Sequence, residues 1–280
     1  MALELMRHRT DVDFSLMPEY FPARLRRHVR IFGRFVRLAE GITDNALLDR
    51  NTRIERLAML EGCISGTAEP DWSADARAVA TGLRNSLRTT GVNDSHCRHI
   101  LKAFRRDLDG VRSHTWDDLM VYCQLAAAPI GRHMLELSGE DVAACARYSD
   151  ALCAALRILR QLRDCEDPSI QDNRLCIPES FMEDAYITSR HLRSSKLKGQ
   201  SKAVVDRVLD GVEQLLTDAH PLPSLIRSRG LRVHIRIVQC RARKLVGCFR
   251  EQDPMQQRVG LTSWQRRTCE WFGFLSGIVG

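Results

Sequence analysis

The length, composition and charge of the chain exclude several classes of protein. Its 280 residues are 44% hydrophobic and 28% charged, which is ordinary for a globular protein with one large core or two small ones. The formal net charge of +7 suits an anionic partner such as nucleic acid, an acidic membrane surface or a phosphorylated substrate, and charge alone does not choose among them.

Cysteine spacing and hydropathy predict a cytoplasmic protein. The ten cysteines are scattered without a CxxC pair and mostly lie in apolar helical company, so we expect reduced core residues. The start MALELMRHRT lacks the long apolar run of a signal peptide. No stretch of about 18 uncharged apolar residues occurs, so no membrane-spanning helix is expected.

Apolar residues recur at helical spacing along most of the chain. In residues 22–41 one stripe joins Val29, Phe32, Val36 and Glu40, and a second apolar stripe runs beside it, so this helix should be buried over much of its circumference. Further helices are predicted at residues 51–65, 72–90, 93–111, 114–138, 141–167, 202–219, 222–229 and 231–251, with a polar loop at 188–202. We therefore predict a single all-α domain over residues 1–280, with eight to ten helices.

Two pairs of acidic residues stand out because they lie at the ends of largely apolar helices. Glu40 and Asp44 are four residues apart on one helix face, and Glu40 continues a buried stripe. Asp164 and Asp167 are three apart at the end of the helix predicted at 141–167. Carboxylates on a core-facing stripe are costly unless paired or metal-bound. Two facing sets can hold Mg²⁺ ions that bridge to a diphosphate, although the spacing equally fits two solvated helix ends.

Five parts of the chain carry, in the same order, the motifs of one enzyme family. They are FPARLRRHV (21–29), FGRFVRLAEGITDN (32–45), WDDLMVYCQLAAAPIGRHMLELSGE (116–140), ALRILRQLRDCEDPSIQDNRLCIP (155–178), and the C-terminal HPLPSLIRSRGLRVHIRIV (220–238) with DPMQQRVGLT (253–262). Through them nearly the whole chain resembles the squalene/phytoene synthase family, and within it the bacterial hydroxysqualene synthases of hopanoid synthesis.

The resemblance implies an all-α fold, the isoprenoid synthase type I helical bundle with a central cavity. Members of this family bind prenyl diphosphates through Mg²⁺, with two or three ions expected, held by two acid-rich motifs. The hydroxysqualene synthases convert presqualene diphosphate to hydroxysqualene without NADPH, so we expect Mg²⁺ and no NADPH here. Head-to-head condensation of two prenyl diphosphates, to presqualene diphosphate or phytoene, is the alternative within the same family.

The same resemblance implies the residues of the site. Glu40, Asp44, Asp164 and Asp167 would hold metal, and Tyr122 and Asp164 would be catalytic. The implied substrate-binding residues are Arg34, Arg37, Arg132, Arg157, Arg160, Arg163 and Arg174. The chain also departs from the family pattern, because Gly41 replaces the second acid of the first motif, Pro168 takes the place of the last acid of the second, Asn173 replaces an aspartate and His234 replaces a glutamate.

The most telling departure is at Arg157 and Arg160, where relatives carry Gln and Asn. Both positions share a helix face with Asp164. In one interpretation the guanidinium groups bind diphosphate, so that fixed positive charge partly replaces metal. In the other they neutralise the acids and take the place of the metal, which leaves a scaffold or assembly factor without turnover.

The C-terminal segment WQRRTCEWFGFLSGIVG, residues 264–280, is rich in aromatic residues. It would cap the bundle, guard an apolar channel or touch a membrane, and capping is the favoured interpretation. No nucleic-acid-binding motif occurs, so the basic charge fits a diphosphate and anionic lipid better than DNA. We therefore expect a cytoplasmic protein, with peripheral contact with the inner membrane left open, as is the oligomeric state.

Overall fold

The computed structural model describes residues 16–68, 70–165, 177–194 and 197–278. Within these ranges the chain forms helices and no strand, which confirms the all-α prediction. A short 3-10 turn, η1 (Pro18–Tyr20), precedes α1 (Ala23–Asp44), α2 (Arg50–Ser65), α3 (Ala74–Thr90), α4 (Ser95–Leu108), α5 (Trp116–Ala126), α6 (Ala128–Ser138) and α7 (Val142–Asp164). Then follow α8 (Glu179–Asp184), α9 (Ser189–Ser194), α10 (Gln200–Asp218), α11 (Leu222–Leu225), α12 (Arg229–Glu251) and α13 (Ser263–Ile278).

Local signals explain where several helices begin. Thr115 caps α5 in a reciprocal arrangement with Asp118, in which each side chain accepts from the backbone of the other. This agrees with the start of the helix predicted at 114–138. Asp141 caps α7 by accepting from the amide of Ala144. These side chains satisfy backbone N–H groups that have no partner within the helix.

The helix predicted at 114–138 is divided into α5 and α6 at Ala127. Pro129 lies at the start of α6, where its missing N–H costs no helical hydrogen bond. Gly131 lies where α6 meets α7, since a Cβ atom there would stand 2.3 Å from Ser149 Oγ and 2.7 Å from Cys153 Sγ. The proline therefore marks the division between the two helices, and the glycine allows α6 and α7 to pack closely.

The C-terminal third differs from the prediction in three places. The loop predicted at 188–202 contains α9 and the first residues of α10, and the helix predicted at 222–229 shrinks to the four residues of α11. The third difference is the aromatic C-terminal segment, for which no helix is predicted: it forms α13, which packs along α12. Proline at positions 221 and 223 limits α11, because Pro cannot sit inside a longer helix without removing a hydrogen bond.

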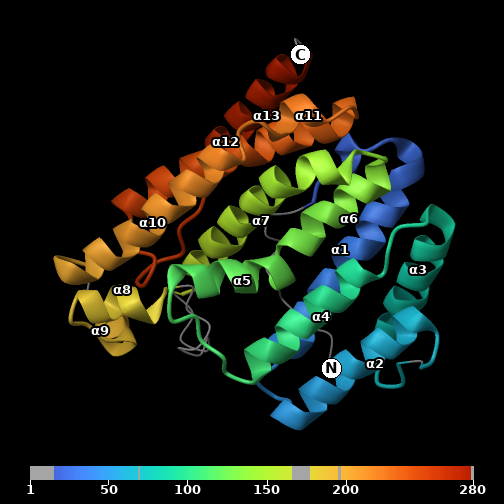
Figure 1. Cartoon of the computed structure of the whole chain (residues 1–280), viewed down its shortest axis with the longest axis horizontal. Helices are drawn as coiled ribbons and strands as arrows, with labels where there is room; N and C mark the ends of the chain where they lie inside the picture. The colour runs from blue at the N-terminus through green and yellow to red at the C-terminus, as the bar shows by residue number, and fades with distance from the viewer. Residues whose placement is uncertain (1–15, 69, 166–176, 195–196, 279–280) are drawn as a thin grey trace.

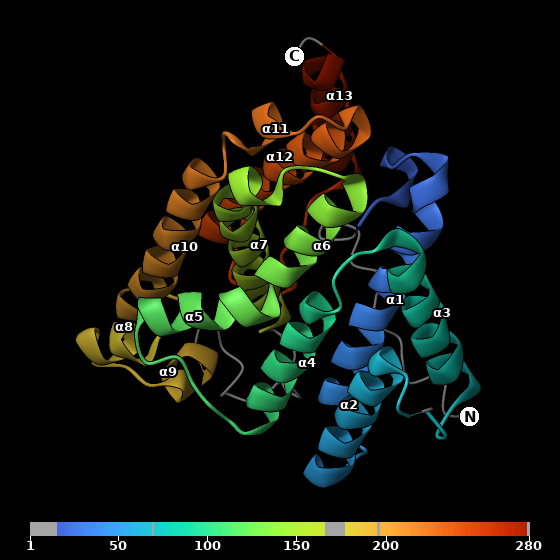
Figure 2. The same cartoon turned by 45° about the vertical axis from the view of Figure 1, so that its right-hand side comes forward.

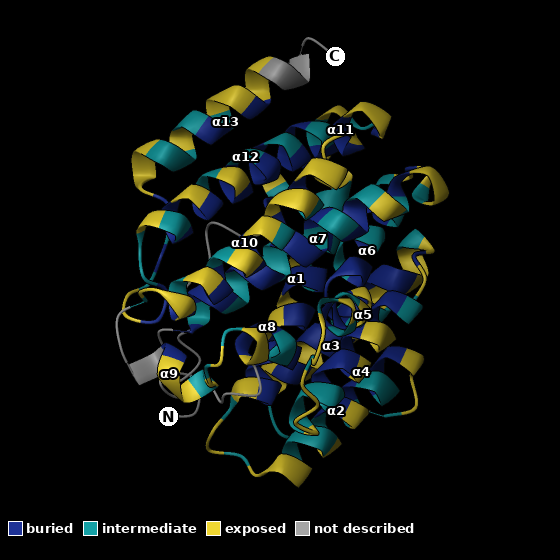
Figure 3. Ribbon diagram, turned by 60° about the vertical axis from the view of Figure 1, so that its left-hand side comes forward, coloured by how far each residue is buried: buried dark blue, intermediate teal, exposed yellow. Residues whose placement is uncertain are grey.

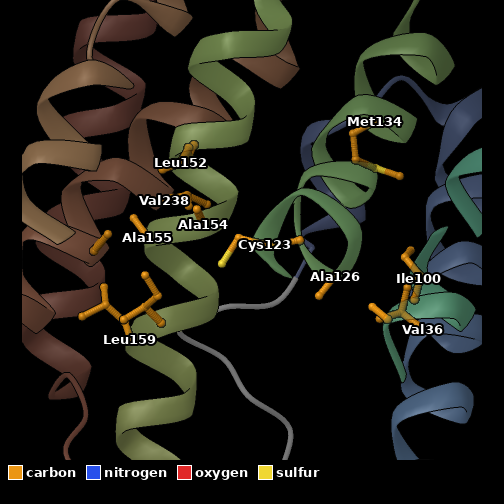
Figure 4. Close-up of a cluster of buried hydrophobic side chains, with 14 of the residues drawn as sticks. Val36, Ile100, Cys123, Ala126, Met134, Leu152, Ala154, Ala155, Leu159 and Val238 are labelled. Carbon is orange, nitrogen blue, oxygen red and sulfur yellow. The ribbon is translucent and has the colours of Figure 1, made fainter. Parts of the chain in front are cut away.

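Helix α7 lies in the middle of the molecule (Figures 1 and 2) and packs against α5, α6, α10, α11 and α12. Helices α1 to α4 form the neighbouring part of the bundle, with α1 packed on α3 and α4. Figure 4 shows how side chains from both parts enter one core, among them Val36 of α1, Ile100 of α4, Met134 of α6, Leu159 of α7 and Val238 of α12. This arrangement places the inner faces of α1 and α7 opposite each other.

Candidate active site

A cluster of charged side chains lies between the C-terminal halves of α1 and α7. Glu40 is 6% exposed because it continues the apolar stripe of Val29, Phe32 and Val36, all of which are buried. The prediction that this acid faces the core is therefore confirmed. A buried carboxylate needs a charged or hydrogen-bonding partner, and α7 supplies it.

Arg160 binds Glu40 through both oxygen atoms. Its Nη1 donates to Oε1 over 2.7 Å and its Nη2 to Oε2 over 2.8 Å, which is the two-pronged geometry that makes arginine–carboxylate pairs strong. The Glu40 carboxylate raises the pKa of Arg160 above its ordinary value. Arg157, one turn earlier on α7, places its Nη1 3.6 Å from the same carboxylate, so one buried acid faces two guanidinium groups.

Arg157 also starts a hydrogen-bonded chain toward α4. Its Nη2 donates to the hydroxyl of Tyr122 over 2.6 Å, and that hydroxyl donates to Oδ2 of Asp107 over 2.9 Å. Burial raises the pKa of Tyr122, which keeps the phenol neutral at pH 7. Burial by itself would lower the pKa of Arg157, yet Tyr122, Asp107 and Glu40 together raise it, so the guanidinium stays charged.

Asp164 lies at the outer edge of the cluster, at the last residue of α7. Three guanidinium groups surround its carboxylate: Arg163 at 3.6 Å, Arg160 at 3.9 Å and Arg258 at 3.9 Å. Its side chain is 31% exposed, unlike that of Glu40. The second acid motif therefore offers a partly solvated carboxylate in a strongly positive surrounding.

These residues line a cavity of about 70 Å³. Its wall contains four acidic residues, the two arginines that face Glu40 and three other residues. They are Glu40, Asp44, Asp107 and Asp164, then Arg157 and Arg160, then Phe104, Thr43 and Gln161. Asp44 is exposed and lies one turn beyond Glu40 at the end of α1. Asp164 of the second acid motif thus lies at the same cavity as Glu40 and Asp44 of the first.

The side chains around Glu40 do not fit a magnesium ion as they stand. Mg²⁺ requires carboxylate oxygens in near-octahedral geometry, whereas both oxygens of Glu40 accept from Arg160. Among the described residues no group of three or more His, Cys, Asp or Glu side chains is arranged to hold a metal. Asp167, the fourth predicted ligand, lies outside those residues, and the metal-ligand set stays a prediction.

A second cavity, of about 80 Å³, lies farther along α7. Ser149 and Cys153 line it and share an α7 face with Arg157, Arg160 and Asp164. The rest of its wall is mostly apolar, with Ile130, Met134, Leu152, Leu231, Ile235 and Val238. A polar and an apolar cavity therefore follow each other along one helix face, one turn apart.

The structure does not bring every predicted substrate-binding arginine to this cluster. Arg132 forms a two-pronged ion pair with Asp150, which lies 14 residues before Asp164 and hence roughly 21 Å away along α7. Arg34 pairs with Asp75 of α3, and Arg37 is exposed on α1. Arg174 lies outside the described residues. Of the predicted set, Arg157, Arg160 and Arg163 join the acids directly.

Two residues of the cluster were missed by sequence reasoning. Asp107 ends a stripe on α4 that begins with the buried Ile100 and Phe104, so it gives the same signal as Glu40, an acid that continues an apolar face. Arg258 belongs to the segment DPMQQRVGLT, which supports the family resemblance, and the structure places its Nη1 beside Asp164.

Comparison with known proteins agrees with the motifs. A family described as squalene/phytoene synthase matches residues 7–267. The chain belongs to the squalene/phytoene synthase family. It is therefore a member of a family of prenyl diphosphate enzymes that typically depends on Mg²⁺.

Curated relatives of the family cover most of the chain. A hydroxysqualene synthase of Rhodopseudomonas palustris is 31% identical over 254 residues, which is 91% of this chain and 84% of the relative. Another hydroxysqualene synthase, of Zymomonas mobilis, is 29% identical over 249 residues, or 88% of this chain and 80% of the relative.

Solved structures of family members share the fold. A dehydrosqualene synthase in complex with a ligand superposes with a TM-score of 0.80 at 17% identity, covering 97% of this chain and 93% of that one. The squalene synthase HpnC from Alicyclobacillus acidocaldarius gives a TM-score of 0.71 at 22% identity, covering 89% and 93%. The predicted fold class, the helical bundle of this family, is confirmed.

Proposed function

We propose that the protein converts presqualene diphosphate to hydroxysqualene, by loss of diphosphate and capture of the cation by water. The single observation that carries this proposal is the pair of cavities on one face of α7. The polar one presents Arg157 and Arg160, and the apolar one lies a turn away. A substrate with an anionic head and long hydrocarbon chains requires both surroundings side by side. The hydroxysqualene synthase relatives support the choice of reaction.

In the first step the bond between carbon and the diphosphate oxygen breaks, and the diphosphate leaves with the electron pair. Positive charge placed beforehand around the leaving group stabilises that separation. The guanidinium groups of Arg157, Arg160 and Arg163 supply positive charge here. Arginine suits diphosphate because a guanidinium can donate two parallel hydrogen bonds to it. The residues around Glu40 do not fit Mg²⁺, so no step is assigned to it.

In the second step water adds to the rearranged cation and loses a proton. Tyr122 and Asp107 form a route for that proton, since the phenol oxygen can accept from water while its own proton passes to Asp107, 2.9 Å away. Before substrate enters, Arg157 holds the phenol by a 2.6 Å hydrogen bond. This gives Tyr122 the catalytic role that the resemblance implies.

Both cavities are smaller than the roughly 300 Å³ at which small-molecule sites begin. Arg157 lies one turn from Cys153, which lines the apolar cavity, so we expect its side chain to move when a long-chain substrate enters. That movement would free Arg157 to bind the diphosphate, while Arg160 keeps Glu40 neutralised.

Incubation of the purified protein with presqualene diphosphate tests the proposal. We expect release of diphosphate and a C30 alcohol in the organic extract, with added Mg²⁺ or with a chelator as paired conditions. Formation of presqualene diphosphate or phytoene from shorter prenyl diphosphates would establish the condensation alternative instead. Absence of all turnover under both conditions would establish the scaffold alternative, in which Arg157 and Arg160 replace the metal without catalysis.

Two substitutions separate the parts of the site. Tyr122→Phe should lower kcat about 100-fold, because positioned proton transfer contributes on this order. Tyr148→Phe on α7 is the matched control. Asp164→Ala should lower activity if that carboxylate orients Arg163 and Arg258 or binds metal. Full activity of the Asp164 variant would show that Asp164 has no role in catalysis, and would not contradict the proposed reaction.

A further inference from the structure

Helix α13 presents an outward face that is unusually apolar for a surface helix. Trp264 is 72% and Trp271 70% exposed, and Phe272, Phe274 and Leu275 are exposed as well. At 100° per residue these five side chains fall on one arc of the helix, with Trp264, Trp271 and Leu275 at its centre. Figure 3 shows α13 along one edge of the molecule, with exposed residues along its length.

The opposite face of α13 is fixed to α12. Cys269 is fully buried, and Gly273 lies against Ile237 so closely that a Cβ atom would stand 2.4 Å from its Cγ1. Arg241, 2% exposed, donates to Glu270 over 2.6 Å. The aromatic side chains are therefore held outward by a well-packed helix, and their exposure is not a consequence of a loosely attached one.

Positive charge surrounds this apolar face. Arg267 is exposed on α13 itself, and Arg243 is exposed on the neighbouring α12. Beside them a hollow of about 650 Å³ opens between α11, α12 and α13, and its lining includes Arg236, Arg243, Lys244 and Phe272. Lys244 also lies over the ring of Trp264, 5.7 Å from its centroid. The one acid of residues 263–275, Glu270, is already bound by Arg241.

We propose that the outward face of α13, with the basic side chains of α12 beside it, docks on the surface of an anionic lipid bilayer. Trp and Phe side chains flanked by Arg and Lys are the composition that places a helix in the interface between headgroups and acyl chains. Basic residues near the bilayer are attracted by its negative surface potential, and the net charge of +7 acts in the same direction.

The mode of contact is peripheral. None of the helices in the described ranges is long and apolar enough to cross a membrane, and α13 is one side of a packed helix pair. The docking surface is separate from the charged cluster on α7, and the inference does not depend on which reaction that cluster performs.

Co-sedimentation with lipid vesicles tests the inference. Full-length protein should bind vesicles of equal parts phosphatidylglycerol and phosphatidylcholine, and bind pure phosphatidylcholine much more weakly. Trp264→Ser with Trp271→Ser should weaken binding to the anionic vesicles more than about tenfold. Arg243→Ser and Arg267→Ser should each weaken it about fivefold, and added salt should reduce the effect of the charges.

The matched control removes two exposed apolar side chains elsewhere. Leu47 is 76% and Tyr186 90% exposed, so Leu47→Ser with Tyr186→Ser should leave vesicle binding unchanged. Equal losses in the control and the tryptophan variant would overturn the proposal, as would equal binding to both kinds of vesicle. A third result would also overturn the proposal: the wild-type protein is a dimer, and the tryptophan substitutions convert it to a monomer without changing vesicle binding. A second copy of the chain would then cover this face. Unchanged melting temperatures of all variants exclude misfolding.

Discussion

The two halves of the inner face of α7 differ in chemistry although they belong to one continuous helix. From Arg157 to Asp164 the face carries guanidinium and carboxylate groups that neutralise one another across to α1 and α4. From Ser149 to Cys153 it meets α6 through Gly131 and an apolar cavity with α12. The first half is thus specified by charge pairing, the second by steric fit.

This difference predicts which kind of substitution should destabilise each half. At a buried ion pair, removal of one partner lowers the free energy of unfolding most, because the other is left as an uncompensated charge. At a close helix–helix contact, added side-chain volume lowers the free energy of unfolding most. The following predictions test these two behaviours, beginning with the largest expected effect.

Removal of the guanidinium at Arg160 should be the most damaging change. Arg160→Gln leaves Glu40 buried without its two-pronged partner, so we expect the free energy of unfolding to fall by about 3–5 kcal/mol. Glu40→Gln in the same chain should restore much of that loss, because the buried carboxylate that Arg160 neutralised is then gone. Denaturant titration of the two single variants and the double variant measures the coupling.

The exposed pair of Arg34 and Asp75 provides the control for that experiment. Both side chains are about half exposed, so Arg34→Gln should cost less than about 1 kcal/mol. A loss for Arg160→Gln as small as that of the control would mean that water reaches Glu40 and that the charge pairing does not specify this half of α7.

Added volume at Gly131 should damage the other half. Gly131→Ala places a Cβ atom 2.3 Å from Ser149 Oγ. We expect the free energy of unfolding to fall by about 1–3 kcal/mol, because α6 must move away from α7. Ser149→Ala in the same chain should recover part of it. Gly247→Ala on α12 is the matched control, since nothing lies within 4 Å of its new methyl group; it should stabilise the protein by about 0.5–1 kcal/mol.

Acid should act on the apolar half through His234, which lines its cavity. Burial, aided by Arg241, lowers the pKa of His234 to about 4. Since the unfolded histidine has an ordinary pKa of about 6.5, the unfolded state binds the proton first, and stability falls as the pH drops from about 6.5 to about 4. At pH 5 the free energy of unfolding should be lower by about 2 kcal/mol than at pH 7 through this residue.

His234→Leu should remove that contribution. Unfolding titrations of both proteins at pH 7 and pH 5 should show a smaller decrease for the variant by about 2 kcal/mol, whatever the difference between the two proteins at pH 7. Parallel decreases would show that His234 accepts a proton in the folded protein without cost, and that the apolar half tolerates charge.

Sequence patterning predicted the fold and part of the site for identifiable reasons. Helical periodicity placed Glu40 on the buried face of α1 because the same 3.6-residue repeat orients Val29, Phe32 and Val36. Arg157 and Arg160 were predicted on the face of Asp164 for the same reason. Helix capping at Thr115 was equally local, since it involves residues three positions apart.

Partners from distant helices could not be predicted in this way. The pairing of Arg160 with Glu40 joins residues 120 positions apart. The pairing of Arg132 with Asp150 holds a predicted substrate-binding arginine away from the acids. Asp107 and Arg258 enter the cluster only because α4 and the segment before α13 fold beside α7. Periodicity fixes the direction of a side chain on its own helix, and says nothing of what faces it.

The sequence by itself therefore determined that the protein is a helical bundle with acidic residues turned inward, and its motifs indicated the squalene/phytoene synthase family. Only the tertiary structure decided that Glu40 is neutralised by Arg160, that Tyr122 connects Arg157 to Asp107, and that α13 turns its tryptophans outward. The physical reason is that helix formation depends on residues three and four positions apart, whereas charge pairing and exposure depend on packing between helices that the chain brings together over long distances.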